Sequence, residues 1–126
     1  MKVSELMRTG GAVPVVRSKT PMKDVIYEMS RKGIGVTTVI DDGDRVVGII
    51  SDGDLRRHLE RDDQLLQRKA EDVMTRNPKT IEAEDLATEA LNLMEEKKIT
   101  SLLILDEERK IQGIIHLHDL WRTEMF

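Results

Sequence analysis

Residues 48–55 read Gly-Ile-Ile-Ser-Asp-Gly-Asp-Leu, and residues 113–120 read Gly-Ile-Ile-His-Leu-His-Asp-Leu. The two stretches are 65 positions apart, and the same offset aligns residues 20–57 with residues 85–122 at ten identical positions. The chain is therefore an internal duplication. A copy of about 60 residues buries only about 60% of its unfolded surface and is marginally stable alone. We therefore expect the two copies to pack on each other, with the functional site on their shared surface.

Composition limits the class of protein. The chain has 126 residues, 39% hydrophobic and 35% charged, which fits one compact domain or two interdependent subdomains. It has no cysteine, so disulfides and thiolate metal sites are excluded. No apolar run approaches the ~20 residues of a membrane helix and no signal-peptide pattern opens the chain, so we expect a cytoplasmic protein with no membrane partner. A net charge of -4 with three aromatic residues argues against nucleic acid as a partner.

Hydrophobic periodicity predicts the same element order in each copy: strand, helix, strand, strand, helix. The first helix of each copy is expected to open at a capping residue, which is Thr20 before Pro21 in the first copy and Asp85 in the second. The strand pairs are nearly continuous apolar runs, which is typical of strands covered on both faces. The predicted elements include strands 13–16, 36–40 and 46–50 and a helix at 52–59 in the first copy, and strands 101–105 and 111–115 and a helix at 117–125 in the second.

Short segments ending in methionine lead into the copies. Residues 3–7 end at Met7 and residues 70–74 end at Met74. The stretch before the second of these segments is polar and basic, as a linker would be. The sequence is therefore divided into a first repeat with its lead-in (1–61), a linker (62–69) and a second repeat (70–126).

This pattern resembles a known module. A duplicated unit that closes with Gly-apolar-apolar-(Ser/Thr)-x-x-Asp-Leu is similar to the tandem cystathionine-β-synthase-type (CBS) domain pair, or Bateman module. More narrowly, residues 51–57, 73–78 and 116–120 resemble the carboxy-terminal CBS pair of bacterial arabinose-5-phosphate isomerases. The resemblance implies an α+β (α/β) fold of two β-α-β-β-α repeats related by pseudo-two-fold symmetry. It also implies a homodimer formed through CBS pairs.

The resemblance implies regulation, with no catalysis by this chain itself. Such a pair binds a nucleotide or nucleotide sugar in the cleft between its repeats, and CMP-linked 3-deoxy-manno-octulosonate or an adenine nucleotide is the expected effector, with no other cofactor. The expected partner is a sugar-isomerase catalytic domain, an aldose-ketose isomerase of the 3-deoxy-manno-octulosonate and lipopolysaccharide pathway, which normally precedes the pair and is missing from this sequence. The alternative is a purely structural dimerisation module that binds no ligand.

The first copy offers candidate ligand contacts at Ser51 and Asp54, where a strand ends and a helix begins. Backbone amides and the Ser51 hydroxyl suit a phosphate, and the Asp54 carboxylate can accept two hydrogen bonds from a ribose diol. Gly35, Val36 and Thr37, at the start of the middle strand, would line the base pocket through their backbone. The alternative is that Ser51 and Asp54 form a capping box that only closes the helix, worth about 1 kcal/mol.

The second copy differs where the ligand would bind, because His116 and His118 replace Ser51 and Gly53. His116 either donates to a ligand oxygen, with a pH dependence near neutrality, or is held at the strand end by backbone hydrogen bonds. The remaining candidates in this copy are Asp119, Thr100 and Ser101, by their repeat positions.

Two further interpretations concern charge and chemistry. Arg57 and Arg122 stand at equivalent repeat positions, which favours symmetric contacts to phosphate or carboxylate. Two histidines with one carboxylate are an incomplete ligand set, so no metal site is expected. A small enzyme built on His116, His118 and Asp119 is the least favoured function.

Overall fold

The computed structural model describes residues 1–123, which form two compact units. The first unit is residues 13–78, and the second unit combines residues 1–12 with the chain from residue 79 onward. These units differ from the sequence repeats, because the lead-in helix α1 (Val3–Leu6) belongs to the second unit and α4 (Ala70–Val73) belongs to the first. Each unit is thus completed by the lead-in of the other copy.

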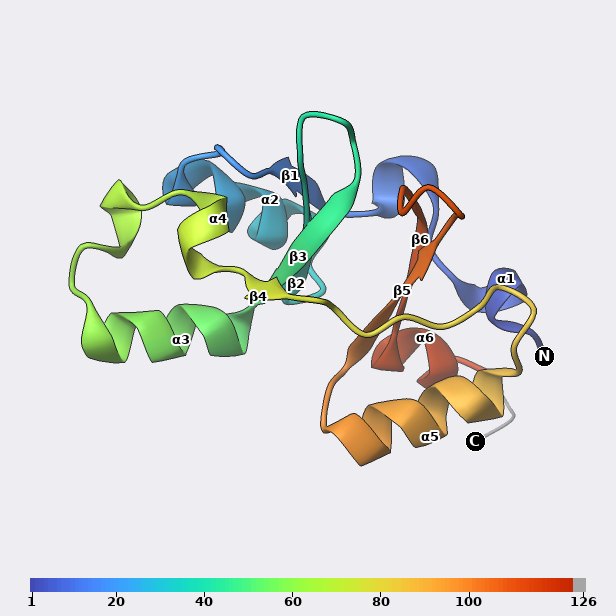
Figure 1. The fold of residues 1–126 in the computed structure, drawn as a ribbon. Coiled ribbons are helices and arrows are strands. Elements are labelled where there is room, and N and C mark those ends of the chain that lie inside the picture. Colours follow the sequence, from blue (N-terminus) through green and yellow to red (C-terminus); the bar gives the residue numbers. More distant parts are fainter. Residues whose placement is uncertain (124–126) are drawn as a thin grey trace. The chain divides into compact units, whose positions relative to one another are not determined.

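The first unit is built on a four-stranded sheet in the order β1-β2-β3-β4. β1 is parallel to β2, whereas β3 is antiparallel to both β2 and β4 (Figure 1). The fourth strand, which the sequence did not predict, follows the lead-in of the second copy. The elements are β1 (Val15–Arg17), α2 (Met22–Lys32), β2 (Val36–Ile40), β3 (Val46–Ser51), α3 (Asp52–Arg61), the 3-10 turn η2 (Leu65–Gln67), α4 and β4 (Thr75–Arg76).

The core of the first unit lies between this sheet and its helices. One face of α2 buries Met22, Val25 and Met29 against Val39 and Ile50 of the sheet. Apolar residues of β1, η2 and α4 complete the cluster. Burial of these side chains, at about 25 cal/mol per Å² of apolar surface, is the main force that holds the helices on the sheet.

The second unit repeats this arrangement with shorter outer strands. β5 (Ser101–Leu105) and β6 (Ile111–His116) form an antiparallel pair. An isolated parallel bridge joins Thr80 to Leu103, where the first unit has the β1-β2 pair, and an antiparallel bridge joins Arg8 to Ile114, where the first unit has the β3-β4 pair. The opening strand predicted for the second copy is therefore reduced to a single bridge.

Three helices cover one face of the β5-β6 pair. α1, α5 (Ala87–Lys97) and α6 (Leu117–Trp121) bury apolar side chains in one cluster with residues of both strands (Figure 1). Val3 of α1 is fully buried in this cluster. The first residues of the chain are therefore part of the core of the second unit.

Three predicted helix boundaries are wrong. The N-cap residues are Pro21 and Leu86, one position after the predicted Thr20 and Asp85. The Thr20 hydroxyl instead accepts a hydrogen bond from the Arg17 N–H, which closes a turn before the helix. The last helix was predicted to reach Met125 but ends at Trp121, and residues 124–126 lie outside the described part of the chain.

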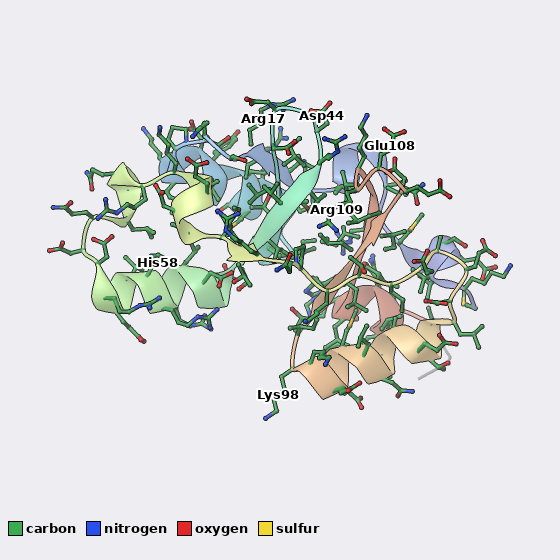
Figure 2. All side chains as sticks on the ribbon, viewed as in Figure 1. Arg17, Asp44, His58, Lys98, Glu108 and Arg109 are labelled. Atoms are coloured by element: carbon green, nitrogen blue, oxygen red, sulfur yellow. The ribbon has the colours of Figure 1, made fainter. Side chains whose placement is uncertain are left out.

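The hairpin turns between the paired strands are built alike in both units. The Asp41 carboxylate accepts from the N–H groups of Gly43 and Arg45, and Asp106 accepts from the equivalent N–H groups of Glu108 and Lys110. One residue of each turn has a left-handed backbone conformation, Asp44 in the first unit and Arg109 in the second. The Asp44 carboxylate also forms an ion pair with Arg17 of β1 at 3.0 Å (Figure 2).

The first helix of each copy ends at an equivalent left-handed residue. This residue is Gly33 after α2 and Lys98 after α5. The Lys98 side chain extends from the end of α5 (Figure 2). Among residues 1–123, no helix is long and apolar enough to cross a membrane.

Candidate functional site

In the first unit, three segments meet at the end of β3. Val36 at the start of β2 pairs with Ser51 at the end of β3, and the Gly35 carbonyl accepts a 3.0 Å hydrogen bond from the N–H of Asp52, the first residue of α3. Gly35 has φ +70°, and a Cβ there would lie 2.8 Å from a carboxylate oxygen of Asp52. The positive φ at this position favours glycine, because other side chains rarely adopt it.

Asp54 is the centre of this site. It is only 6% exposed, and one carboxylate oxygen accepts from both the N–H (2.8 Å) and the hydroxyl (3.1 Å) of Ser51. The other oxygen accepts from Arg57 (2.7 Å) and from the Thr75 hydroxyl (2.9 Å). Because Ser51 Oγ also accepts from the Asp54 N–H, the capping box considered from the sequence is confirmed.

The ionised form of Asp54 is stabilised by these contacts. Burial raises the pKa of the Asp54 carboxyl, but hydrogen bonds from the Ser51 N–H, Thr75 and Arg57 outweigh it, so the pKa lies below its ordinary value. Thr75 was not among the sequence candidates. The sequence feature that could have indicated Thr75 is its position directly after Met74, the last residue of the second lead-in segment.

In the second unit, the same backbone frame surrounds His116 and Asp119. Ser101 pairs with His116, and the Thr100 carbonyl accepts a 2.8 Å hydrogen bond from the N–H of Leu117, the first residue of α6. The Asp119 carboxylate accepts from the His116 N–H at 3.0 Å, as Asp54 does from Ser51. The predicted residues of the second copy are therefore brought together within one unit.

Asp119 is held by two arginines. Arg8 donates to both carboxylate oxygens, through Nε at 3.1 Å and Nη2 at 2.9 Å, and Arg122 donates to one of them. Asp119 is 3% exposed. Burial raises the pKa of its carboxyl, but the hydrogen bonds from Arg8 and from the His116 N–H outweigh it, so the pKa lies below the ordinary value.

His116 is the capping residue of α6. Its Nδ1 accepts a 3.1 Å hydrogen bond from the His118 N–H, and its ring lies edge-on to the His118 ring with 4.5 Å between centroids. Burial lowers the pKa of His116, and the neighbouring His118 lowers it further. The interpretation of His116 as a residue held by backbone hydrogen bonds is confirmed at Nδ1.

The two sites are equivalent in backbone and different in charge. Arg57 and Arg122, at matching repeat positions, each donate to the central carboxylate. The neutral Thr75 of the first unit corresponds to the cationic Arg8 of the second, since each follows a lead-in methionine and contacts that carboxylate. The second site therefore carries one more positive charge than the first among the groups that touch its carboxylate.

Each unit also holds a buried hydroxyl without a hydrogen-bond partner. These hydroxyls belong to Thr38 and Ser101. Because side chains alternate along a strand, Thr38 shares the sheet face of Val36 and Ser51, and Ser101 shares that of His116. Thr37 lies on the opposite, helix-covered face with Ile50, so only its backbone is available to the site.

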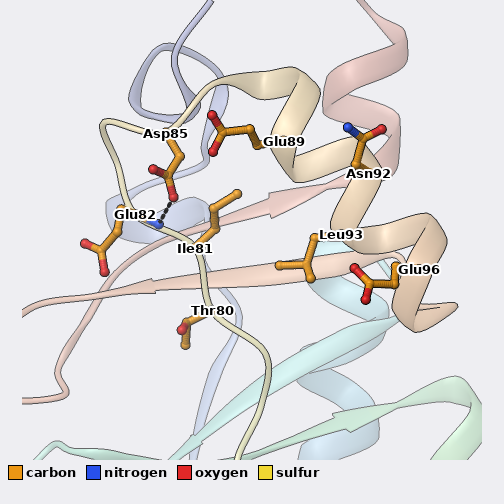
Figure 3. Close-up of a pocket in the computed structure, with 8 residues that line it drawn as sticks. All are labelled: Thr80, Ile81, Glu82, Asp85, Glu89, Asn92, Leu93 and Glu96. Atoms are coloured by element: carbon orange, nitrogen blue, oxygen red, sulfur yellow. Dashed lines mark hydrogen bonds between the residues drawn. The ribbon is translucent and has the colours of Figure 1, made fainter.

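A separate cavity of about 410 Å³ lies between α5 and the segment before it, within the second unit (Figure 3). Four of its lining side chains are acidic: Glu82, Asp85, Glu89 and Glu96. None of the predicted site residues lines it. Among the described residues, no group of three or more histidine and acidic side chains could hold a metal ion.

Comparison with known proteins identifies the family. The model of the CBS domain matches residues 3–61 and 70–120, and this chain belongs to the CBS-domain family. It is 41% identical over 123 residues to arabinose 5-phosphate isomerase KdsD of Pseudomonas aeruginosa. This match covers 98% of this chain and 38% of that protein. The chain thus spans less than half of that relative's length.

Solved structures agree with the fold. CBSX2 in complex with AMP is 26% identical with a TM-score of 0.84, covering 96% of this chain and 93% of that one. The CBS domain pair of protein MJ0100, solved with 5'-methylthioadenosine and S-adenosyl-L-methionine, is 20% identical with a TM-score of 0.85, covering 97% and 94%. The predicted CBS-pair fold, and the resemblance to the CBS region of these isomerases, are confirmed.

Proposed function

We propose that this chain is a regulatory module that binds a nucleotide or nucleotide sugar at the strand ends around Asp54 and Asp119. The observation that carries the proposal is the pair of buried, unpartnered hydroxyls of Thr38 and Ser101, on the sheet faces that carry Ser51 and His116. Buried polar groups in folded proteins nearly always have a partner, so each hydroxyl keeps a hydrogen-bonding capacity that a ligand group could use. The AMP bound by CBSX2 supports a nucleotide as that ligand.

The proposed contacts are assigned from the residue types around the site. The backbone of Gly35, Val36 and Thr37 faces the base, Ser51 contacts phosphate, and Asp54 contacts the ribose diol. A carboxylate has about four lone-pair sites, and all four are already used at Asp54. Arg57 is 61% exposed and is easily resolvated, so one hydroxyl of the diol would displace Arg57 from Asp54. The other hydroxyl would take the site that the Ser51 hydroxyl leaves when it turns from Asp54 to the phosphate.

The corresponding contacts in the second unit are Thr100, Ser101, His116, His118 and Asp119. Since Nδ1 of His116 is an acceptor, its Nε2 carries the proton of the neutral ring and is a donor for a ligand oxygen. Arg122 is 70% exposed and would be the displaced cation here, while Arg8 stays on Asp119.

One observation favours a second function. Both central carboxylates are fully engaged within the chain, as they would be if they only closed α3 and α6 in a structural dimerisation module. Such a module needs no ligand and loses nothing when Thr38 and Ser101 are made apolar. The two functions therefore differ in whether changes at these two positions weaken the binding of a ligand.

Replacing Ser101 with alanine and Thr38 with valine is expected to show which of the two functions, ligand binding or structural dimerisation, the chain has. Each change removes an unpaired hydroxyl, so the free protein should gain about 1 kcal/mol in the free energy of unfolding. AMP and CMP-linked 3-deoxy-manno-octulosonate are the probes. The ligand that binds should raise the stability of the unsubstituted chain by ~2.7 kcal/mol at about 100 times its dissociation constant, and the two variants should bind it about tenfold more weakly.

Thermal unfolding with and without each probe, followed by calorimetric titration, provides the measurement. Dideoxyribose analogues of the probes are the matched control, because they lack the diol assigned to Asp54. If neither probe changes the unfolding temperature of the unsubstituted chain at millimolar concentration, the structural function is preferred.

We further propose that the module works as a homodimer and controls an arabinose-5-phosphate isomerase domain of the 3-deoxy-manno-octulosonate pathway. The KdsD relatives, of which this chain matches about 38%, support this assignment. Native mass spectrometry of the purified chain is expected to show two copies. A mass that corresponds to one copy at micromolar concentration would contradict the dimer.

A further inference from the structure

We propose that protonation of His116 releases the first turn of α6, so that pH switches the second unit's site between a capped and an uncapped form. The consequence for ligand binding rests on the proposed function above. The switch itself concerns only residues of the second unit.

The hydrogen bond at Nδ1 is the basis of the switch. A histidine nitrogen accepts a hydrogen bond only when it carries no proton, so the bond from the His118 N–H to His116 Nδ1 requires the neutral ring. Protonation turns Nδ1 of His116 into a donor that faces the His118 N–H, so the hydrogen bond is lost and the cap is removed. In the first unit, Ser51 stands at the equivalent repeat position, its hydroxyl accepts from the N–H of Asp54, and it does not titrate near neutrality.

The charges around His116 decide where it titrates. Arg8, which follows α1, and His118 on α6 disfavour the cation, whereas Asp119 on α6 favours it. Asp119 is itself paired with Arg8 and Arg122. Burial of the ring is the largest influence and lowers the pKa of His116. The neutral form of the ring is therefore favoured more strongly in the folded chain than in the unfolded chain.

The direction of the pH dependence follows. A histidine whose pKa falls on folding contributes stability that is complete above its unfolded value of about 6.5 and is lost as the pH drops through the lower folded value. We therefore expect the α6 cap to be intact at pH 8 and weakened near pH 5.

α6 is sensitive to the loss of one cap because it is short. It has five residues, Leu117–Trp121, and helices of this length are not stable without tertiary contacts and capping. Its Leu120 is fully buried in the core of the unit, and its Trp121 is the only tryptophan of the chain. The Trp121 ring lies 5.4 Å from that of His118, so its fluorescence reports on this helix.

The test compares the unsubstituted chain with H116S, which copies the serine cap of the first unit. Amide exchange of His118, whose N–H donates to His116 Nδ1, and of Leu120, corrected for intrinsic rates, should lose protection about fivefold between pH 8 and pH 5 in the unsubstituted chain. The same amides in H116S should lose none. Trp121 fluorescence should follow the same pattern, and H118Q removes the contribution of the neighbouring ring.

H116N provides a second capping residue in case H116S folds poorly, and S51H should transfer the pH dependence to the amides of α3. Equal pH dependence in the unsubstituted chain and both position-116 variants would overturn the switch. Titrations with AMP and with CMP-linked 3-deoxy-manno-octulosonate at pH 8 and pH 5 then test its link to binding. Absence of binding by both AMP and CMP-linked 3-deoxy-manno-octulosonate at both values contradicts the proposed function alone, because amide exchange requires no ligand.

Discussion

Replacing Asp119 with alanine is expected to lower the free energy of unfolding by about 3 kcal/mol, the lower end of the range for breaking a buried ion pair. The substitution leaves Arg8, whose side chain is only 25% exposed, without its two-oxygen partner. It also removes the acceptor of the His116 N–H and so weakens the start of α6. Arg122 is largely exposed and should contribute little. Urea unfolding followed by circular dichroism and by Trp121 fluorescence gives the measurement.

Asp54 in the first unit is the matched control for this substitution. Asp54→Ala should cost only about 1–2 kcal/mol, because its partners are the neutral Thr75 and the exposed Arg57, both easily solvated. Since folding lowers the pKa of Asp119, its contribution is complete above the unfolded value near 3.8 and is lost as the pH falls through the folded value. The difference between the unsubstituted chain and Asp119→Ala should therefore be full at pH 7 and should shrink at pH 3. Equal costs for the two alanine variants would contradict the role given to Arg8.

The repeated architecture could be predicted from sequence because it depends on local patterns. The two Gly-Ile-Ile stretches fix the duplication, and the Asp41 and Asp106 turns follow from side chains that bond to their own neighbouring backbone. Asp54 and Asp119 could be placed at helix starts for the same reason. All of these interactions join residues that are close in sequence.

The exchange of lead-ins between the units could not be predicted. The repeat pattern shows that residues 3–7 correspond to residues 70–74, but it does not show which copy each segment covers. That choice depends on long-range contacts, such as Val3 in the core of the second unit and the Arg8 bridge to Ile114. Arg8 and Thr75 donate to the two central carboxylates, and the sequence alone could consequently not assign them to these partners.

The second large effect is expected at Gly113, where the lead-in passes closest to β6. A Cβ at this position would lie 2.8 Å from the Arg8 carbonyl oxygen and 2.8 Å from Met7 Sδ. The methionine side chain can move, but the Arg8 backbone exchanges hydrogen bonds with Ile114 and cannot move without breaking them. Gly113→Ala should therefore cost about 2–3 kcal/mol, the upper part of the range for overpacking. Chemical unfolding provides the measurement.

Gly11→Ala is the control, since Gly11 has no atom within 4 Å of a built Cβ and no positive φ. It should change the free energy of unfolding by less than about 0.5 kcal/mol. Gly48→Ala should behave like Gly113→Ala, because its Cβ would lie 2.9 Å from the Thr75 carbonyl oxygen. A cost at Gly113 no larger than at Gly11 would mean that the lead-in adapts to the added methyl group.

The double variant with Asp119→Ala tests how the Gly113 effect is transmitted. Moving the Arg8 backbone also moves its guanidinium away from Asp119, so both substitutions damage the same ion pair. Their combined cost should then fall short of the sum of the single costs by 0.5 kcal/mol or more, as for residues in one network. Strict additivity would show that the lead-in and the carboxylate stabilise the second unit independently. A shortfall would show that the amino-terminal residues stabilise the second unit partly by holding Arg8 on Asp119.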